Sequence, residues 1–324
     1  MSQLRNCVSL LFVLDALGAI CFGQAKPKLL PTPQPITEQV EHGRYWKYIP
    51  RTVSAKSQVL VACHGMFKEN DTADNAARVT LDKWIALANE TGTVVIAPIF
   101  DNERYGCTVP CPQNWGYRGL FGRQVGADEF VHEILDRLKE ANPQYDGRMV
   151  LFGFSAGGQF VARYVVMHPE RVIAAVAGAS AWFPFPNPDV QWPNGMKRRQ
   201  RVIRWPGEKE DQVIDVKPNP ENWVAAAELP LLVISGAQDL EVQKHDENQG
   251  GDTHPERSQA WTKAMNDYAA AQGHTGRVKV SIVPNVDHSI TNISKASAQF
   301  LKDEIQKQQR RPANTKPATT KKAA

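Results

Sequence analysis

The sequence predicts an α/β domain in which helices cover both faces of a doubly wound, mainly parallel β-sheet. Segments with strand patterns alternate along the chain with segments of helical periodicity, which is the order that such a sheet requires. Several strand segments are apolar throughout, as strands buried on both faces are. The 324 residues suffice for one large domain, and the sequence contains no internal repeat, phosphate-binding loop or dinucleotide-binding glycine motif.

The first segment, residues 1–25, has the features of a signal peptide. A basic residue precedes an apolar run, and Gly23-Gln24-Ala25 fits a cleavage site of small residues. Asp15 interrupts the apolar run, so a retained amphipathic anchor is the alternative. Residues 26–40 are rich in proline and predict an extended linker. We therefore expect a secreted or periplasmic protein whose main α/β domain spans residues 41–308.

The domain is expected to contain seven strands and five helices, assigned from periodicity and from the turn residues that bound each segment. The strands are predicted at about 44–49, 58–63, 93–97, 148–153, 172–177, 230–235 and 277–283. The helices are predicted at about 74–89, 124–141, 156–168, 257–272 and 294–308.

A Gly-x-Ser-x-Gly motif, Gly153 to Gly157, lies between a predicted strand and a predicted helix. A strand, a tight turn and a helix with Ser155 at the apex predict a nucleophile elbow, which lifts the serine hydroxyl above a parallel sheet. The alternative is a Gly- and Ser-rich connection of the kind that any α/β protein can contain.

A nucleophilic serine needs a base, and the base needs an acid that orients it. After a nucleophile elbow these partners follow in the order acid, then histidine, each after a later strand. Asp239 lies three residues beyond a glycine-terminated strand, and His288 follows the last predicted strand. We expect both at the carboxyl ends of their strands, where open α/β sheets build sites.

Alternatives exist for both partners. Asp239 also suits a turn or a helix cap, and Glu241 and Asp246 are acidic residues farther from the strand end. Of the eight histidines, His288 is the one that follows a late strand at the required place. The others are interpreted as surface, helix, turn or loop residues, and His254 is placed in a polar loop.

Acyl transfer also needs hydrogen-bond donors for a developing oxyanion. The residue after the nucleophile supplies one backbone N–H, and a loop between an earlier strand and the first helix supplies the other. We therefore assign the oxyanion hole to the backbone N–H groups of Ala156 and Met66. His64 lies in the same turn as Met66 and is expected to brace that turn rather than to act as the base.

The elbow, the His64-Gly65 turn, Asp239 and His288, in this order and on these strands, resemble the α/β-hydrolase superfamily. The resemblance spans roughly residues 44–305. Within the superfamily the chain is similar to secreted serine esterases of the poly(3-hydroxybutyrate) depolymerase and feruloyl esterase group. The stretches that carry this similarity are Arg44-Tyr45-Trp46-Lys47-Tyr48-Ile49-Pro50 and Phe154-Ser155-Ala156-Gly157-Gly158. The resemblance implies an α/β-hydrolase fold, and the chain departs from a minimal hydrolase in carrying an insertion after strand 6.

That insertion, about 182–228, is aromatic-rich and is predicted to form a lid or a pocket wall. Its aromatic residues are Trp182, Phe183, Phe185, Trp192, Trp205 and Trp223. Such side chains provide rigid apolar surface for an acyl or aromatic group, but they can equally anchor an irregular loop to the core. We select Trp182, and Trp115 from the loop at 105–121, as substrate contacts.

Cysteine spacing suggests a local crosslink. Cys107 and Cys111 could close a small disulfide loop in an oxidising compartment, and two free thiols are the alternative. Cys63 is expected to be a buried structural thiol. No Cys/His spacing suits zinc, so neither a metal nor an organic cofactor is predicted.

Charge argues against nucleic acid as a partner. The formal net charge is +4, and five positive charges without an acid lie in residues 310–324, so the rest of the chain carries −1. The basic tail, 309–324, is of low complexity and is predicted to be disordered. Stable membrane insertion is not expected, because the N-terminal apolar run is short and contains a charge. The sequence does not indicate an oligomeric state.

These features predict a secreted serine hydrolase that cleaves carboxylic esters, either small molecules or polymers, through an acyl-enzyme on Ser155. A serine peptidase or amidase of the same fold is the enzymatic alternative. A catalytically silent binding module is the alternative of a different class, because a fold does not by itself establish a function.

Overall fold

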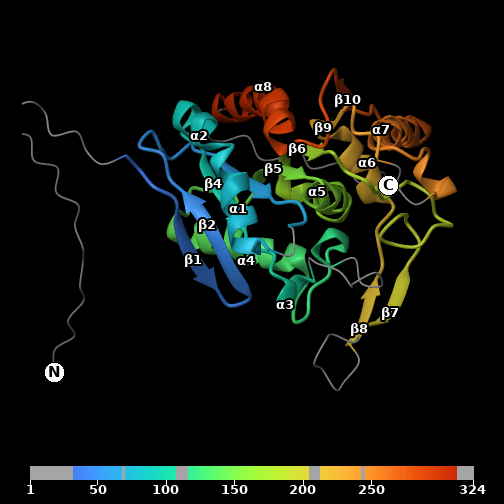
Figure 1. Ribbon diagram of the computed structural model, residues 1–324, viewed down its shortest axis with the longest axis horizontal. Helices are drawn as coiled ribbons and strands as arrows, with labels where there is room; N and C mark the ends of the chain where they lie inside the picture. The colour runs from blue at the N-terminus through green and yellow to red at the C-terminus, as the bar shows by residue number, and fades with distance from the viewer. Residues whose placement is uncertain (1–31, 68–69, 107–115, 204–211, 242–244, 312–324) are drawn as a thin grey trace, which may run out of the picture. The chain divides into compact units, whose positions relative to one another are not determined.

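A mixed eight-stranded sheet lies at the centre of the fold, with the strand order β1-β2-β4-β3-β5-β6-β9-β10 (Figure 1). The computed structural model describes residues 32–67, 70–106, 116–203, 212–241 and 245–311. The strands of this sheet are β1 (Ile36–Val40), β2 (Gly43–Tyr48), β3 (Val59–Cys63), β4 (Val94–Pro98), β5 (Met149–Phe154), β6 (Val172–Gly178), β9 (Leu231–Gly236) and β10 (Val278–Val283). Only the β1–β2 and β2–β4 pairs of this sheet are antiparallel, so the predicted doubly wound, mainly parallel sheet is confirmed.

Helices cover both faces of the sheet within the described residues. They are α1 (Ala73–Asp82), α2 (Ile85–Thr91), α3 (Asn102–Tyr105), α4 (Ala127–Ala141), α5 (Ala156–Met167), α6 (Glu221–Glu228), α7 (His254–Ala271) and α8 (Ile290–Gln309). Short 3₁₀ turns occur at η1 (Gly116–Gly119), η2 (Pro169–Arg171) and η3 (Glu247–Gln249). None of the helices in the described ranges combines the length and the apolarity that crossing a membrane demands.

The alternation of side chains along the strands divides the core into two layers. On one face, Val61 and Leu151 pack in a cluster with residues of α4, α5, α6 and α7. On the other face, Leu60 and Phe152 pack with residues of α1, α2 and α8. Every residue of β3, β5 and β6 is buried, as expected for strands covered on both sides.

The structure corrects the predicted linker. Residues 36–40 form β1 rather than an extended linker, and they pair with β2 across a tight turn. The run of prolines ends at Pro35, and Ile36-Thr37-Glu38-Gln39-Val40 then supplies unblocked N–H groups for the β1–β2 ladder. The domain therefore begins before residue 41.

The predicted helix at 74–89 is two helices, α1 and α2, separated at Lys83 and Trp84. Neither residue is a helix breaker. Trp84 is instead buried with its ring edge against Phe152 of β5, at a centroid distance of 4.6 Å. Tertiary packing therefore overrides local helix propensity at this point.

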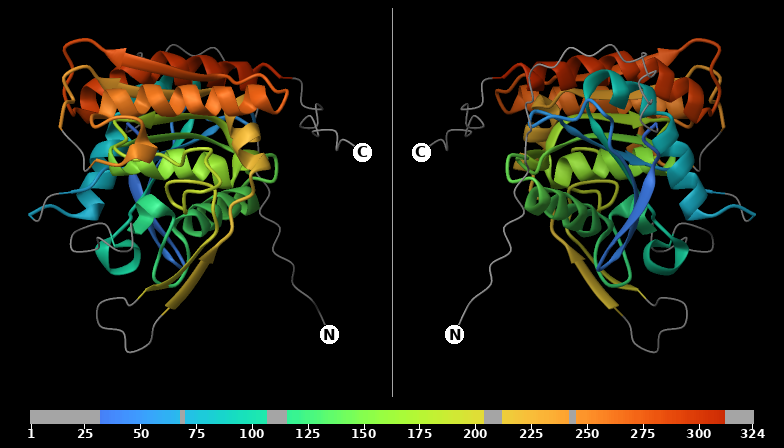
Figure 2. Two further views of the ribbon diagram at one scale, coloured as in Figure 1. Left: turned by 90° about the vertical axis from the view of Figure 1, so that its right-hand side faces the viewer. Right: turned by 90° about the vertical axis from the view of Figure 1, so that its left-hand side faces the viewer.

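The insertion after β6 contains structure that the sequence did not predict. Strands β7 (Arg199–Ile203) and β8 (Gln212–Val216) form a separate antiparallel pair. Helix α6 ends the insertion and leads into β9. The β7–β8 pair extends away from the eight-stranded sheet (Figure 2).

Candidate active site

Three of the predicted functional residues follow parallel strands of the sheet. Ser155 comes directly after β5, Asp239 lies three residues beyond the end of β9, and His288 lies five residues beyond the end of β10. Strands β5, β6, β9 and β10 are neighbours and all run parallel. The three residues therefore lie at one edge of the sheet, at the carboxyl ends of its strands.

Ser155 occupies the apex of a strained turn between β5 and α5. Its backbone has φ 56° and ψ −115°, a left-handed conformation that residues with a side chain rarely adopt. The turn is held on both sides, because the Ser155 N–H donates to the Gly178 carbonyl at 2.8 Å and the Ser155 carbonyl accepts from the Gln159 N–H at 3.0 Å. Backbone strain of this kind is common at functional residues.

Close packing of α5 makes this turn possible. A Cβ atom built on Gly157 would lie 2.2 Å from the carbonyl oxygen of Cys63, at the end of β3. Only glycine therefore allows α5 to start so near the neighbouring strand. Residues 153–157 thus have the strand–turn–helix geometry that the Gly-x-Ser-x-Gly motif predicted.

Asp239 and His288 are in direct contact. The His288 Nδ1 lies 2.8 Å from Asp239 Oδ2, and the side chains are 34% and 1% exposed, respectively. An ionised carboxylate only accepts hydrogen bonds, so Nδ1 carries the proton and donates to it. The Nε2 atom is then the nitrogen that can accept a proton from a hydroxyl group.

The loops that carry the pair are joined to each other and to the elbow. The Ala237 N–H donates to the Val283 carbonyl at 2.9 Å, and the Gln238 N–H donates to the Val286 carbonyl at 2.8 Å. On the elbow side, the Phe154 ring lies next to the His288 ring, with centroids 4.8 Å apart. The histidine is therefore positioned between the acid loop and the residue that precedes Ser155.

The pKa of Asp239 reflects both its burial and its partners. Burial alone would raise this pKa, but contacts with His254 and His288 outweigh that effect and lower the pKa to about 2. The carboxylate is therefore ionised at neutral pH, as an acid that stabilises a histidine must be.

His254 belongs to this site and is not part of a polar loop as predicted from the sequence. It is the first residue of α7, is 3% exposed, and its Nδ1 lies 3.1 Å from Asp239 Oδ1. Its ring is also near the His288 ring, with centroids 5.1 Å apart. Thr253 and Glu256 form a capping box around Pro255, and this signal would have placed the helix start here.

The turn after β3 is rigid and braced by His64. This histidine is fully buried; its Nε2 accepts from the Phe100 N–H at 3.2 Å, so Nδ1 is the protonated nitrogen and donates to the Gly65 carbonyl at 2.7 Å. Burial lowers the pKa of His64 to about 4, and the ring is neutral. The Tyr117 hydroxyl donates to the His64 carbonyl at 2.8 Å, which fixes the turn further.

The two residues assigned to the oxyanion hole are sequence neighbours of residues that pack together, because Ala156 follows Ser155 and Met66 follows Gly65. A Cβ atom built on Gly65 would be 3.3 Å from the Ser155 Cβ, so the turn that carries Met66 packs against the elbow. Ala156 is buried at the first position of α5, whereas the Met66 side chain is 43% exposed. Within the described ranges, the backbone N–H of neither residue donates to a backbone carbonyl outside the helices and strands.

Most aromatic residues of the insertion anchor it to the core. Phe183, Trp192 and Trp223 are fully buried. The indole N–H groups of Trp223 and Trp261 both donate to the Pro184 carbonyl, at 3.0 and 2.8 Å. These three rings therefore have the core-anchoring role that the sequence left open, because apolar rings are more stable in the core than at the surface.

Trp182 is the predicted substrate contact that the structure describes. It is partly buried and follows β6 by four residues, and the Arg257 guanidinium lies 4.4 Å from its ring centre. Arg257 also donates to the Ala181 carbonyl at 2.8 Å. Helix α7 thus contacts the Trp182 loop through Arg257 and Asp239 through His254. Trp115 lies outside the described residues.

The prediction of a buried structural thiol at Cys63 is confirmed. Cys63 is a free, fully buried thiol, and burial raises its pKa well above the usual value. Cys107 and Cys111 lie outside the described residues.

Two groups of described side chains have ligand atoms within 4.8 Å of one another, as metal ligands would. One is Asp239 with His254 and His288, and the other is Glu41 with His42 and Glu133. The first group contains the Asp239–His288 pair.

Comparisons with known proteins agree with this geometry at the level of fold. No protein-family model and no curated protein sequence matches the chain. Among solved structures, poly(aspartic acid) hydrolase-1 from Sphingomonas sp. KT-1 is similar with a TM-score of 0.65 and 20% identity, over 84% of this chain and 99% of that one.

The poly(3-hydroxybutyrate) depolymerase LpqC from Bordetella parapertussis gives a TM-score of 0.62 at 20% identity, over 82% of this chain and 87% of that one. The fluorophosphonate-binding serine hydrolase FphF from Staphylococcus aureus gives 0.50 at 13% identity, over 84% and 98%. At these identities the similarities establish the fold. The predicted α/β-hydrolase fold is therefore confirmed.

Proposed function

We propose that this protein is a serine hydrolase that cleaves carboxylic esters, with Ser155 as nucleophile, His288 as general base and Asp239 as the acid that orients it. The observation that carries the proposal is the 2.8 Å contact between His288 and the buried Asp239, at the sheet edge where the elbow presents Ser155. A binding module without catalysis would have no need for a strained serine beside such a pair.

The proposed reaction proceeds in two steps. His288 Nε2 takes the Ser155 hydroxyl proton as the oxygen attacks the ester carbonyl, and the Met66 and Ala156 N–H groups stabilise the oxyanion. The tetrahedral intermediate collapses, and His288 gives the proton to the departing alcohol. Water then attacks the acyl-enzyme with His288 again as base, which releases the acid and restores the serine.

We also propose Trp182 as part of the wall that contacts the acyl group. The support is its place on the loop after β6, and its stacking on Arg257 of the helix that begins beside Asp239. Arg257 restrains the Trp182 ring. The ring therefore offers a rigid apolar surface on the side of the candidate site where Asp239 lies. Trp115 remains a second proposed contact.

Hydrolysis of a p-nitrophenyl ester series, from acetate to long acyl chains, tests the proposal. Wild-type protein should hydrolyse at least the short esters, and Ser155→Ala should lose about 10⁴-fold or more in kcat. Trp182→Ala should raise KM for long chains more than for acetate. No activity on any ester, with folding verified by circular dichroism, would contradict the proposal.

The amidase alternative has one specific observation in its favour, the structural similarity to a protein described as a poly(aspartic acid) hydrolase. The same assay with p-nitroanilides of matched acyl groups separates the two. We expect kcat/KM for the ester to exceed that for the anilide. The opposite order, with both activities lost in Ser155→Ala, would assign the protein to amide hydrolysis.

A further inference from the structure

The carboxylate of Asp239 has a second histidine partner. Its Oδ2 accepts from His288, while its Oδ1 faces the Nδ1 of His254 at 3.1 Å. Both atoms of the second contact are buried, they are poorly aligned for a hydrogen bond, and neither has another partner among the described residues. The contact between them is therefore mainly electrostatic, and it engages the carboxylate oxygen that His288 leaves open.

Helix α7 holds His254 in this place. Thr253 caps the helix, and the Glu256 carboxylate accepts from the Thr253 N–H at 2.9 Å and from the Asp252 N–H at 3.0 Å. His254 is the first residue of an 18-residue helix, so the residue that contacts the carboxylate lies at the positive end of the helix dipole. Arg257, one turn later, fixes the helix by donating to Gly251 and Ala181.

A bound cation is the competing interpretation of three clustered ligands. Two of those ligands, Asp239 and His288, already make a 2.8 Å contact, which a metal ion would have to displace. Asp239 and His254 are also almost completely buried, so a hydrated ion would have to lose most of its water to enter. The direct contacts of Asp239 with the two histidines account for the clustering of these side chains without the dehydration of an ion.

We infer that His254 is a positioning residue that holds Asp239 Oδ1, so that Oδ2 stays directed at His288 and carries less of the negative charge. This inference rests on the proposed function, because it assigns His254 a role through the triad. By sharing the carboxylate, His254 reduces the stabilisation that Asp239 gives to a protonated His288. It therefore keeps His288 able to act as a base at lower pH.

Side chains from two loops contact the His254 ring. Asp239 from the β9 loop and His288 from the β10 loop contact it. On its own helix, Glu256 is engaged in the cap, and Arg257 is engaged with Gly251, Ala181 and the Trp182 ring. A His254 substitution therefore removes a contact with the carboxylate of Asp239.

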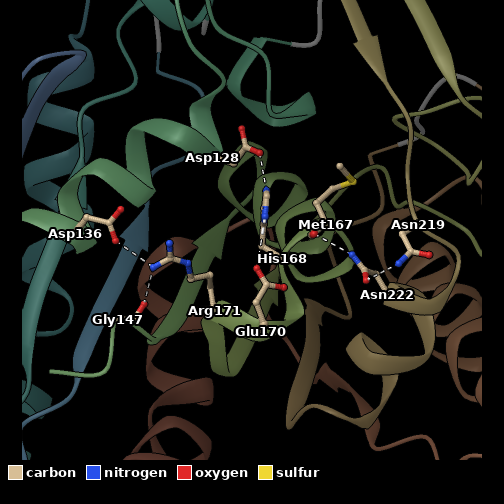
Figure 3. Close-up of polar contacts among 9 residues, drawn as sticks. All are labelled: Asp128, Asp136, Gly147, Met167, His168, Glu170, Arg171, Asn219 and Asn222. Atoms are coloured by element: carbon tan, nitrogen blue, oxygen red, sulfur yellow. Dashed lines mark hydrogen bonds and ion pairs between the residues drawn. The ribbon is translucent and has the colours of Figure 1, made fainter. Parts of the chain in front are cut away.

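Three variants test the inference. His254→Leu removes the contact, and His254→Asn keeps a polar N–H group near the place of Nδ1, which can provide the same electrostatic contact to Oδ1. His168→Leu is the matched control: His168 Nε2 contacts Asp128 Oδ2 at 2.7 Å at the C-terminal end of α5, within a separate group of polar contacts (Figure 3).

The pH dependence of kcat/KM on p-nitrophenyl acetate is the main readout. We expect His254→Leu to lower kcat at neutral pH by about 10- to 100-fold. A loss of this size is typical when a residue that orients a functional side chain is removed. KM should change little, and the acid limb of the profile should move to higher pH. His254→Asn should recover most of kcat, and His168→Leu should leave the profile in place although it lowers the melting temperature.

A measurement without turnover separates this inference from the proposed function. In the Ser155→Ala background, the midpoint of His288 protonation is followed by NMR with and without His254→Leu. An upward shift of the midpoint supports the inference even if no ester is a substrate. An unchanged midpoint and an unchanged pH profile, together with a lower melting temperature, would make His254 a purely structural residue and overturn it.

Discussion

Ser155 and Asp239 each occupy an unfavourable environment that their neighbours compensate. Ser155 has a backbone conformation that costs roughly 1–3 kcal/mol and is held by hydrogen bonds to Gly178 and Gln159. Asp239 is a buried charge, and two histidines stabilise its ionised form. Such locally unfavourable arrangements are expected where a site is built for chemistry.

The lowered pKa of Asp239 predicts how stability depends on pH. Its folded-state pKa of about 2 lies below the 3.8 that is usual for an aspartate, so its contribution to stability is present above the unfolded pKa and is lost as pH falls towards 2. We expect the free energy of unfolding of wild-type protein to fall more between pH 5 and pH 2.5 than that of Asp239→Asn. Urea denaturation at each pH measures both, and parallel curves for the two proteins would contradict this assignment.

At the scale of the elements, helix α5 positions Ser155 through close contacts with strand β3, the η1 segment and the insertion. Gly157 allows α5 to pack against β3. Arg163, farther along α5, forms hydrogen bonds with loops that pack against this helix. The Arg163 guanidinium is fully buried and donates to the Pro193 carbonyl at 2.8 Å and to the Arg118 carbonyl at 2.9 Å. One helix thus fixes the elbow, the η1 segment and the insertion.

Gly157→Ala should displace α5 and weaken the elbow. The new Cβ would meet the Cys63 carbonyl at 2.2 Å, so we expect a loss of about 2 kcal/mol or more in unfolding free energy, together with reduced esterase activity. Gly273→Ala is the control, because Gly273 has φ 81° but no atom within 4 Å of its built Cβ. That variant should lose about 1 kcal/mol from backbone strain alone and keep its activity. Equal effects of the two variants would argue against the packing explanation.

Arg163→Met should loosen the insertion. It removes the donors to the Pro193 and Arg118 carbonyls while preserving most of the side-chain volume. We expect a loss of about 3 kcal/mol and faster amide hydrogen exchange in residues 116–119 and 192–197 than in β5. Uniform exchange throughout the domain would show instead that Arg163 supports the whole fold.

At the scale of the whole molecule, the features that could be predicted from the sequence are the strands, which show hydrophobic periodicity, and the sites at their ends, which the strand order brings together. The seven predicted strands all belong to the main sheet, and Asp239 and His288 meet because parallel strands end at one edge. The β7–β8 pair was missed because β7 begins with the polar run Arg199-Gln200-Arg201, which lacks the apolar alternation of a strand, and because the pair is separate from the main sheet. His254 was missed because its role depends on where α7 begins relative to the β9 loop, which is a tertiary relation.

Export remains a prediction of the sequence at this scale. If residues 1–25 are a cleaved signal, protein recovered from the periplasm or medium of a bacterial host should begin at Lys26. N-terminal sequencing of that fraction gives the result, with a Val13→Arg variant as the control that should block export by breaking the apolar run. A cell-associated protein that retains Met1 would support the anchor alternative instead.

The central claim is that Ser155 is a nucleophile activated by His288, and covalent labelling tests it most directly. Wild-type protein is incubated with a fluorophosphonate, and the adduct is located by peptide mass spectrometry. We predict one adduct per chain on Ser155, abolished in Ser155→Ala and formed at least about 10²-fold more slowly in His288→Ala. A folded wild-type protein that remains unlabelled, or that is labelled elsewhere, would contradict the claim.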